Sequence, residues 1–235
     1  MTNKEKVLEA YKKYAEEFDY EEINKIQFGQ EQFYITESEF LYSLVRDIKP
    51  ITVVEISPDQ GFTTLIILKA LEKNDLSARL FSFDVHDKSK KYDHDGMITR
   101  ELIVGDAKET VKDSLLEKAD FVFIDSDHAY HFGKWYSKKL QILRPGTLIM
   151  VHDWPMYASN GASNNIVAEK AQSTFKEELH NLEVLAVKQY FIDKGYANPV
   201  MNVTDWLKET GKPYYHTRDG VMFRALSPSQ ILVKT

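Results

Sequence analysis

The chain has 235 residues, of which 43% are hydrophobic and 28% charged, and its net charge is -6. This length and composition predict one globular domain with a sizeable core. The acidic balance argues against nucleic acid as a partner, because phosphate binding needs clustered Lys and Arg. The absence of cysteine excludes disulfides, thiolate zinc sites and Cys nucleophiles. No apolar run is long enough to cross a membrane, and the first residues lack the apolar core of a signal peptide, so we expect a cytoplasmic protein without a membrane partner.

The N-terminal part carries two helical patterns. Residues 4–26 place apolar side chains at helical spacing among many Lys and Glu, which predicts an amphipathic helix outside the main sheet. The run Thr36-Glu37-Ser38-Glu39 has the form of a capping box. It predicts the start of a second helix, which buries an apolar face and ends at Lys49-Pro50.

A regular alternation of strands and helices follows. Short apolar strands are predicted at residues 52–56, 79–85, 102–104, 121–124 and 147–151, and helices at 63–73, 107–116 and 130–143. Two further strands are expected at 182–190 and 220–225, with a short helix at 204–209. Continuous apolar strands are typical of parallel sheets that are covered on both faces. The pattern predicts an α/β fold: a doubly wound, Rossmann-like, seven-stranded and mostly parallel sheet with helices on both faces.

Acidic residues or glycine turns follow each of the first five strands. The first strand leads into Glu55, Ser57 and a turn with Gly61, and the later strands end at Asp84, Gly105-Asp106, Asp125 and His152-Asp153. Ligands bind at the carboxyl ends of the strands in open parallel sheets. A glycine turn that feeds a helix allows close backbone approach to a ligand, and an acid after the second strand can accept both ribose hydroxyls of a nucleoside. A strand-end Asp by itself is more often a helix cap than a ligand. We therefore base the prediction of a ligand site on the occurrence of such residues at all five strand ends along one edge of the sheet.

This pattern resembles the class I S-adenosylmethionine-dependent methyltransferases over residues 36–154. The resemblance is carried by VVEISPDQGFTT, FSFDVHD, VGDAKET, FVFIDSDHAY and LRPGTLIMVHDW. It implies that the cofactor is S-adenosyl-L-methionine. The first turn would hold its methionine part, the acid after the second strand its ribose, and the acid after the third strand would lie near its adenine. The implied cofactor-binding residues are Glu55, Ser57, Gly61, Thr63, Asp84, Val85, His86, Asp106, Ala107 and Asp125.

The fourth and fifth motifs are similar to those of the metal-dependent O-methyltransferases that act on sugars and other small molecules. The resemblance implies that Asp125 and Asp153 hold a divalent cation such as Mg²⁺, with His152 as a further candidate ligand. It also implies that His128 is the catalytic base. A cation bound to a hydroxyl lowers the pKa of that hydroxyl, and a nearby His can then accept the proton.

We therefore expect one methyltransferase domain over residues 1–235. It would comprise an N-terminal helical extension (1–35), a cofactor-binding core (36–154) and an acceptor or cap region with the last strands (155–235). The expected activity is O-methylation of a hydroxyl on a sugar, glycoside or other small molecule, and a homo-oligomer is as compatible with the sequence as a monomer.

Two alternatives remain open at this point. The first is a phosphohydrolase that uses the Asp125/Asp127 pair as a strand-end nucleophile pair. The second is a non-catalytic partner subunit with the methyltransferase fold, because the first turn contains only one glycine, Gly61, where most family members have two or three.

Overall fold

The structure is a computed structural model. It describes residues 3–19, 23, 35–93, 95–126, 130–152, 199–202, 215–218, 221–224 and 230–234. The expected helix at 204–209 and the expected strand at 182–190 lie outside the described residues, as does most of the expected cap region.

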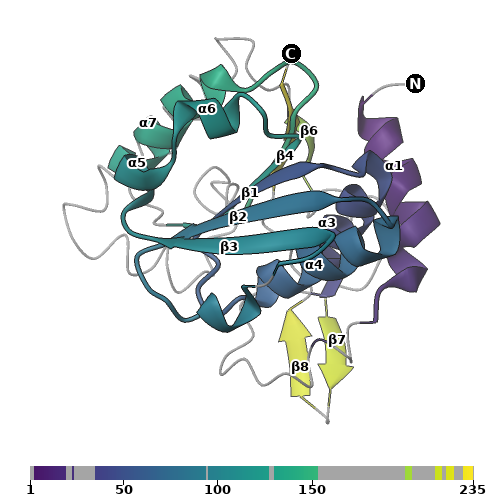
Figure 1. Cartoon of the computed structure of the whole chain (residues 1–235). Helices are drawn as coiled ribbons and strands as arrows, with labels where there is room; N and C mark the ends of the chain where they lie inside the picture. Colours follow the sequence, from purple (N-terminus) through teal and green to yellow (C-terminus); the bar gives the residue numbers. More distant parts are fainter. Residues whose placement is uncertain are drawn as a thin grey trace, which may run out of the picture.

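The centre of the molecule is a parallel sheet (Figure 1). Its parallel strands are β1 (Thr52–Ile56), β2 (Ala78–Asp84), β3 (Ile98–Val104), β4 (Phe121–Ile124) and β5 (Leu148–Val151). They lie in the order β3-β2-β1-β4-β5. The chain therefore reverses its direction of travel across the sheet between β1 and β4, and such a point is where doubly wound sheets bind ligands.

Helices cover both faces of this sheet, as predicted. Helices α1 (Asn3–Tyr14), α3 (Ile35–Ile48) and α4 (Phe62–Asn74) lie together on one side in Figure 1, and α5 (Ala107–Thr110), α6 (Asp113–Leu116) and α7 (Tyr130–Lys139) on the other. Neighbouring residues of one strand belong to different cores. In β1, Val53 packs in the core formed with α1, α3 and α4, whereas Val54 packs in the core formed with α5, α6 and α7. Strand residues alternate between faces, so the apolar runs supply both cores.

The N-terminal helix is shorter than predicted. It ends at Tyr14, and a single 3₁₀ turn follows at Ala15–Glu17. It packs on α3, where the ring of Tyr11 stacks on Phe40 at a centroid distance of 4.2 Å. Helix α3 begins at Ile35, before the expected cap at Thr36, and it ends at Ile48 directly before Lys49-Pro50. The capping-box interpretation of Thr36 and Glu39 is therefore wrong, because Thr36 lies inside the helix and the Glu39 carboxylate accepts a hydrogen bond from the Tyr11 hydroxyl. The Glu37 side chain is fully buried.

The sheet is completed differently from the prediction. The strand expected at 220–225 is present as β8 (Val221–Arg224), but it pairs with β7 (Tyr215–Arg218) in a separate two-stranded sheet (Figure 1). The parallel strands are instead extended by β9 (Gln230–Val233) and then β6 (Pro199–Asn202), both antiparallel to their neighbours. Ile231 of β9 is fully buried, and this burial explains why the last apolar run of the chain lies beside β5.

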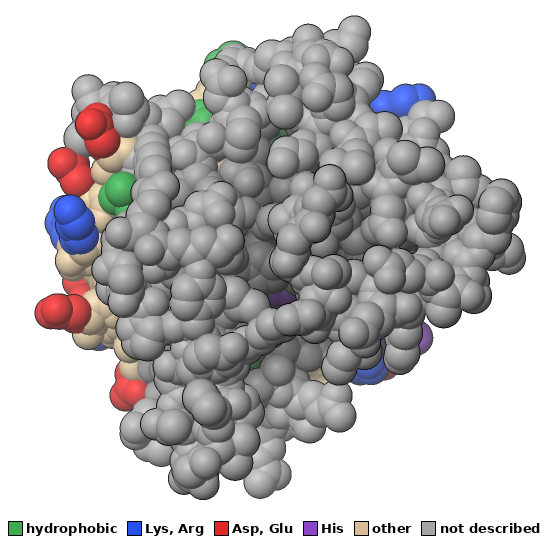
Figure 2. Space-filling view, turned by 180° about the vertical axis from the view of Figure 1, so that it is seen from behind, with side chains coloured by type: hydrophobic (Ala, Val, Ile, Leu, Met, Phe, Trp, Pro, Cys, Tyr) green, Lys and Arg blue, Asp and Glu red, His purple; other side chains and the backbone are tan. Residues whose placement is uncertain are grey.

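Smaller differences concern single elements. The helix expected at 107–116 is divided into α5 and α6, and the last part of the expected third helix is a 3₁₀ turn at Leu140–Ile142. None of the described helices is long and apolar enough to cross a membrane. Described charged side chains visible on the far side of the molecule are of both signs and lie mainly along one margin (Figure 2).

Candidate cofactor site at the carboxyl edge

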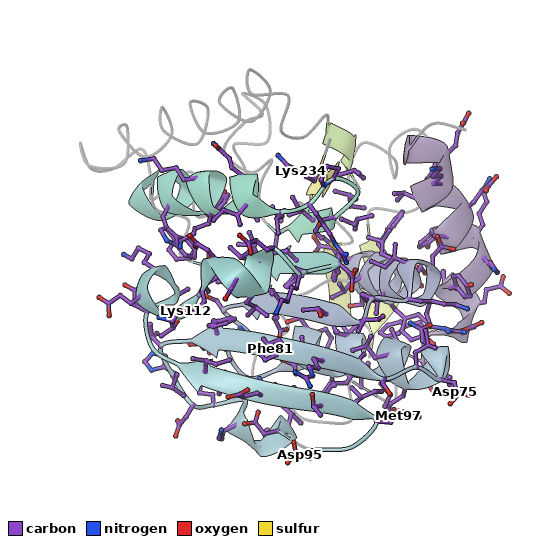
Figure 3. All side chains as sticks on the ribbon, turned by 45° about the horizontal axis from the view of Figure 1, so that its top comes forward. Asp75, Phe81, Asp95, Met97, Lys112 and Lys234 are labelled. Carbon is purple, nitrogen blue, oxygen red and sulfur yellow. The ribbon has the colours of Figure 1, made fainter. Side chains whose placement is uncertain are left out.

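The predicted site residues follow the carboxyl ends of the parallel strands. Asp75 and Met97, which precede β2 and β3, lie at one end of the sheet in Figure 3, and Lys112, which follows β3, lies at the other. Backbone hydrogen bonds join neighbouring strand ends at this second edge. The amide of Ser57 donates to the Phe83 carbonyl (2.7 Å), and that of Gly105 donates to the Asp84 carbonyl (2.8 Å).

Glu55 lies beneath the first turn and is completely buried. Its carboxylate accepts hydrogen bonds from the hydroxyls of Thr63 (2.7 Å), Thr64 (2.8 Å) and Ser82 (2.6 Å). Burial raises the pKa of Glu55, although these three hydroxyls and the charge of Arg100 act in the opposite direction. Glu55 and Thr63 thus fasten the start of α4 to β1 and β2, which is a role in shaping the turn.

The turn after β1 has an unusual backbone. Ser57 and Asp59 have φ angles of 63° and 44°, and Gly61 has a φ of 93°. Positive φ is uncommon for residues other than glycine. A hydrogen bond from the Gly61 amide to the Pro58 carbonyl (2.7 Å) closes the turn.

Gly61 is also required by a neighbour that the sequence did not reveal. A Cβ atom at this position would lie 2.5 and 2.6 Å from two ring carbons of Tyr92, which belongs to a 3₁₀ turn (Lys90–Tyr92) between β2 and β3. The ring of Tyr92 therefore packs on the glycine backbone. This contact by itself explains why position 61 has to be a glycine, so no ligand is needed to explain it. No pattern in the sequence links Gly61 with Tyr92.

Asp84 connects the first turn to the end of β2. It is 7% exposed, and its two carboxylate oxygens accept hydrogen bonds from the backbone amides of Asp59 and His86, both at 2.9 Å. A carboxylate oxygen can accept more than one hydrogen bond, so these contacts orient the group and still allow it to bind a hydroxyl. Val85, the next residue, is 60% exposed, and His86 is exposed.

Asp106 acts as a helix cap. It is the N-cap residue of α5, where its side chain accepts a hydrogen bond from the Lys108 amide (2.9 Å). The Lys108 ammonium group lies 3.3 Å from the same carboxylate. Ala107 is buried against the core on the α5, α6 and α7 side. The common structural role of a strand-end Asp thus explains this residue.

Asp125 and His152 stand side by side after β4 and β5. Strand pairing places Ile124 opposite Val151, and the His152 amide donates to the Ile124 carbonyl (2.9 Å). The Nδ1 atom of His152 lies 3.0 Å from Oδ1 of Asp125, and its Nε2 atom lies 3.4 Å from Oε2 of Glu37. Burial by itself lowers the pKa of His152, but the carboxylates of Asp125 and Glu37 outweigh it, so the pKa is raised well above its ordinary value.

The remaining predicted site residues lie outside the described part of the chain. His128, the expected base, and Asp153, an expected metal ligand, both belong to this group, as does Asp127. Within the described ranges, no cluster of three His, Asp or Glu side chains is arranged to hold a metal ion. A metal-bound imidazole needs a nitrogen lone pair, whereas both ring nitrogens of His152 face carboxylates. The observed contacts therefore do not favour His152 as a ligand, and Asp125 and Asp153 stay a prediction.

Comparisons with known proteins agree with this fold. Residues 54–154 match a family model described as a methyltransferase domain. No curated protein matches the sequence. A methyltransferase from Podospora anserina, solved with S-adenosylhomocysteine, is similar at 13% identity and a TM-score of 0.52, covering 97% of this chain and 87% of its own.

A second solved structure has a similar likeness. It is an O-methyltransferase from Streptomyces achromogenes involved in tomaymycin synthesis, solved with S-adenosylmethionine. Its identity is 15% and its TM-score 0.51, with 97% of this chain and 90% of the other covered. The match identifies residues 54–154 as a methyltransferase domain, and the two solved methyltransferases share the fold of the chain.

Proposed function

We propose that the protein transfers the methyl group of S-adenosylmethionine to a hydroxyl oxygen of a small molecule. The observation that carries the cofactor part is the Asp84 carboxylate. It lies at the carboxyl edge, next to the switch point of the sheet, and the backbone of the first turn orients it. The O-methyltransferase from Streptomyces achromogenes, which has the same fold, supports the acceptor part.

The residues at this edge fit a nucleoside cofactor. Asp84 would accept hydrogen bonds from the two ribose hydroxyls. The exposed side chain of Val85 would offer an apolar contact beside it, and the positive-φ turn at Ser57 and Gly61 would bring backbone close to the methionine part. The sulfonium of the bound cofactor supplies an already activated methyl group, so the protein mainly has to align it with the acceptor oxygen and to exclude water.

The acceptor side of the proposal depends on Asp125, His128 and Asp153. Asp125 ends β4 at the carboxyl edge, where an acceptor hydroxyl would have to lie. We propose that His128 takes the hydroxyl proton and that Asp125 and Asp153 hold a divalent cation such as Mg²⁺, whose oxygen preference they match. A sugar or glycoside acceptor is the most specific form of the proposal, and it rests on the resemblance of the fourth and fifth motifs.

Binding of S-adenosylhomocysteine tests the cofactor part. We expect titration calorimetry to detect binding of this product and no binding of NAD. Asp84→Asn should weaken the affinity about 10- to 100-fold, because a charged acceptor of two hydroxyls is replaced by a neutral one. Asp75→Asn is the matched control, because Asp75 lies at the opposite end of the sheet and asparagine tolerates its left-handed backbone. An equal loss of affinity in both variants, or none in Asp84→Asn, would contradict the assignment.

Turnover tests the acceptor part. We expect S-adenosylhomocysteine to form when the protein is incubated with S-adenosylmethionine and a panel of sugars, glycosides and phenols. Activity should disappear after exhaustive chelation and return with Mg²⁺ or Mn²⁺. Full activity in the chelated protein would rule out metal assistance and leave only the base-assisted reaction.

A further inference from the structure

Three side chains from distant parts of the chain form a buried row that ends at the carboxyl edge. Glu37 comes from α3, Asp125 follows β4 and His152 follows β5. Glu37 and His152 are 0% and 6% exposed, whereas the side chain of Asp125 is 28% exposed. The row therefore runs from the interior, at Glu37, to the edge where the proposed methyl transfer takes place, at Asp125.

Two carboxylates flank the ring of His152. Its Nδ1 atom lies 3.0 Å from Oδ1 of Asp125, which is hydrogen-bond distance, and its Nε2 atom lies 3.4 Å from Oε2 of Glu37, a contact longer than an ordinary hydrogen bond. A buried polar group costs free energy unless it has a partner, so Glu37 supplies the second of the two contacts that orient the ring.

We infer that Glu37 is a positioning residue of the methyl-transfer site, which holds the ring of His152 so that His152 holds the carboxylate of Asp125 at the carboxyl edge. The inference rests on the proposed function. Glu37 precedes the segment that matches the family model, residues 54–154. In this inference, His152 supports the carboxylate of Asp125 from the interior of the protein. In metal and active sites, partners of this kind often affect activity 10- to 100-fold.

The first test separates positioning from folding. Glu37→Gln keeps the shape of the side chain, and Glu39→Gln is the matched control, because Glu39 lies on the same helix but binds the Tyr11 hydroxyl of α1. With an acceptor found in the panel above, we expect Glu37→Gln to lower kcat about 10- to 100-fold. Its affinity for S-adenosylhomocysteine should stay unchanged, and Glu39→Gln should keep normal kcat.

A double-mutant cycle then asks whether Glu37 acts through His152. If it does, Glu37→Gln should have little further effect on kcat in a His152→Gln background, because contacting residues of one network are not additive. Multiplicative effects of the two substitutions would overturn the inference. So would a normal kcat in folded Glu37→Gln.

Nuclear magnetic resonance of the ring protons gives a readout that does not need the reaction. We identify the ring C–H signals of His152 by their loss in His152→Gln, and we expect Glu37→Gln to shift these signals and Glu39→Gln to leave them in place. Ring signals unchanged in Glu37→Gln would overturn the inference. If the protein binds no S-adenosylhomocysteine but the ring signals shift in Glu37→Gln, the proposed function fails while the contact between Glu37 and His152 holds.

Discussion

The glycine of the first turn offers the sharpest test of how the site is built. Gly61 has a φ of 93°, and a Cβ atom added there would lie 2.5 and 2.6 Å from two ring carbons of Tyr92 and 3.0 Å from the Cβ atom of Ser89. Gly61→Ala therefore introduces two separate costs. One is the left-handed backbone conformation, and the other is the collision with the Tyr92 ring.

The expected magnitude follows from these two costs. A side chain in the left-handed region costs about 1–2 kcal/mol, and overpacking of this kind costs about 1–3 kcal/mol. We expect Gly61→Ala to lower the free energy of unfolding by about 2–5 kcal/mol. The half-buried ring of Tyr92 can shift, which favours the lower part of this range.

Gly146 provides the matched control, because it has a similar φ of 88° but no atom within 4 Å of an added Cβ. Gly146→Ala should cost only the backbone part, about 1–2 kcal/mol. Urea unfolding measures both variants. In thermal unfolding, the difference between them should correspond to about 2–12 °C, at about 2–4 °C per kcal/mol for a domain of this size.

A third variant isolates the ring. In a Tyr92→Ala background, Gly61→Ala should cost no more than Gly146→Ala does in the normal chain. Equal destabilisation by Gly61→Ala and Gly146→Ala in the presence of Tyr92 would refute the reasoning. The glycine would then be required only by its backbone angle.

Two further predictions concern buried charges. Because burial raises the pKa of Glu55, the side chain contributes stability that is complete below its ordinary pKa and is lost as the pH rises through the raised value. We expect the stability of the unmodified protein, relative to Glu55→Gln, to fall in urea unfolding as the pH rises above the ordinary pKa of a glutamate, and parallel pH profiles would contradict this. Arg100 is 2% exposed and binds Ser89 and Asp93, so Arg100→Met should cost about 3–5 kcal/mol. The exposed Arg79 of β2 is its control, since Arg79→Met should change stability by no more than about 0.5 kcal/mol.

Much of the fold could be predicted from local patterns. The five parallel strands and the helices between them follow from short apolar runs that alternate with helical spacing, and α3 ends before Pro50 because proline disfavours a helical residue before it. The acids at the carboxyl ends could also be found, because the end of a strand is visible in the sequence. Asp84 and Asp125 therefore lie at the predicted edge of the sheet.

The last strands could not be assigned in this way. The pattern at 220–225 has the periodicity of a strand, and a strand forms there, but periodicity does not say which strand it pairs with. The choice of β9 as the neighbour of β5 depends on which apolar run fills the edge of the core, and Ile231 does so from near the end of the chain. Tertiary contacts, and not the local sequence, determine which distant segments pair.

The same division applies to the site. The residue types at the strand ends indicate a nucleoside ligand, because an acid after the second strand and a turn after the first suit a nucleoside. The cofactor and the class of reaction come from the resemblance of the motifs to a known family. Only the tertiary structure decides that Glu55 supports the turn from below, that Tyr92 packs on Gly61 and that Glu37 reaches His152. These contacts join residues that are far apart in the chain or on different faces of the sheet. Their energy comes from burial and pairing in the folded core, which leaves no local pattern in the sequence.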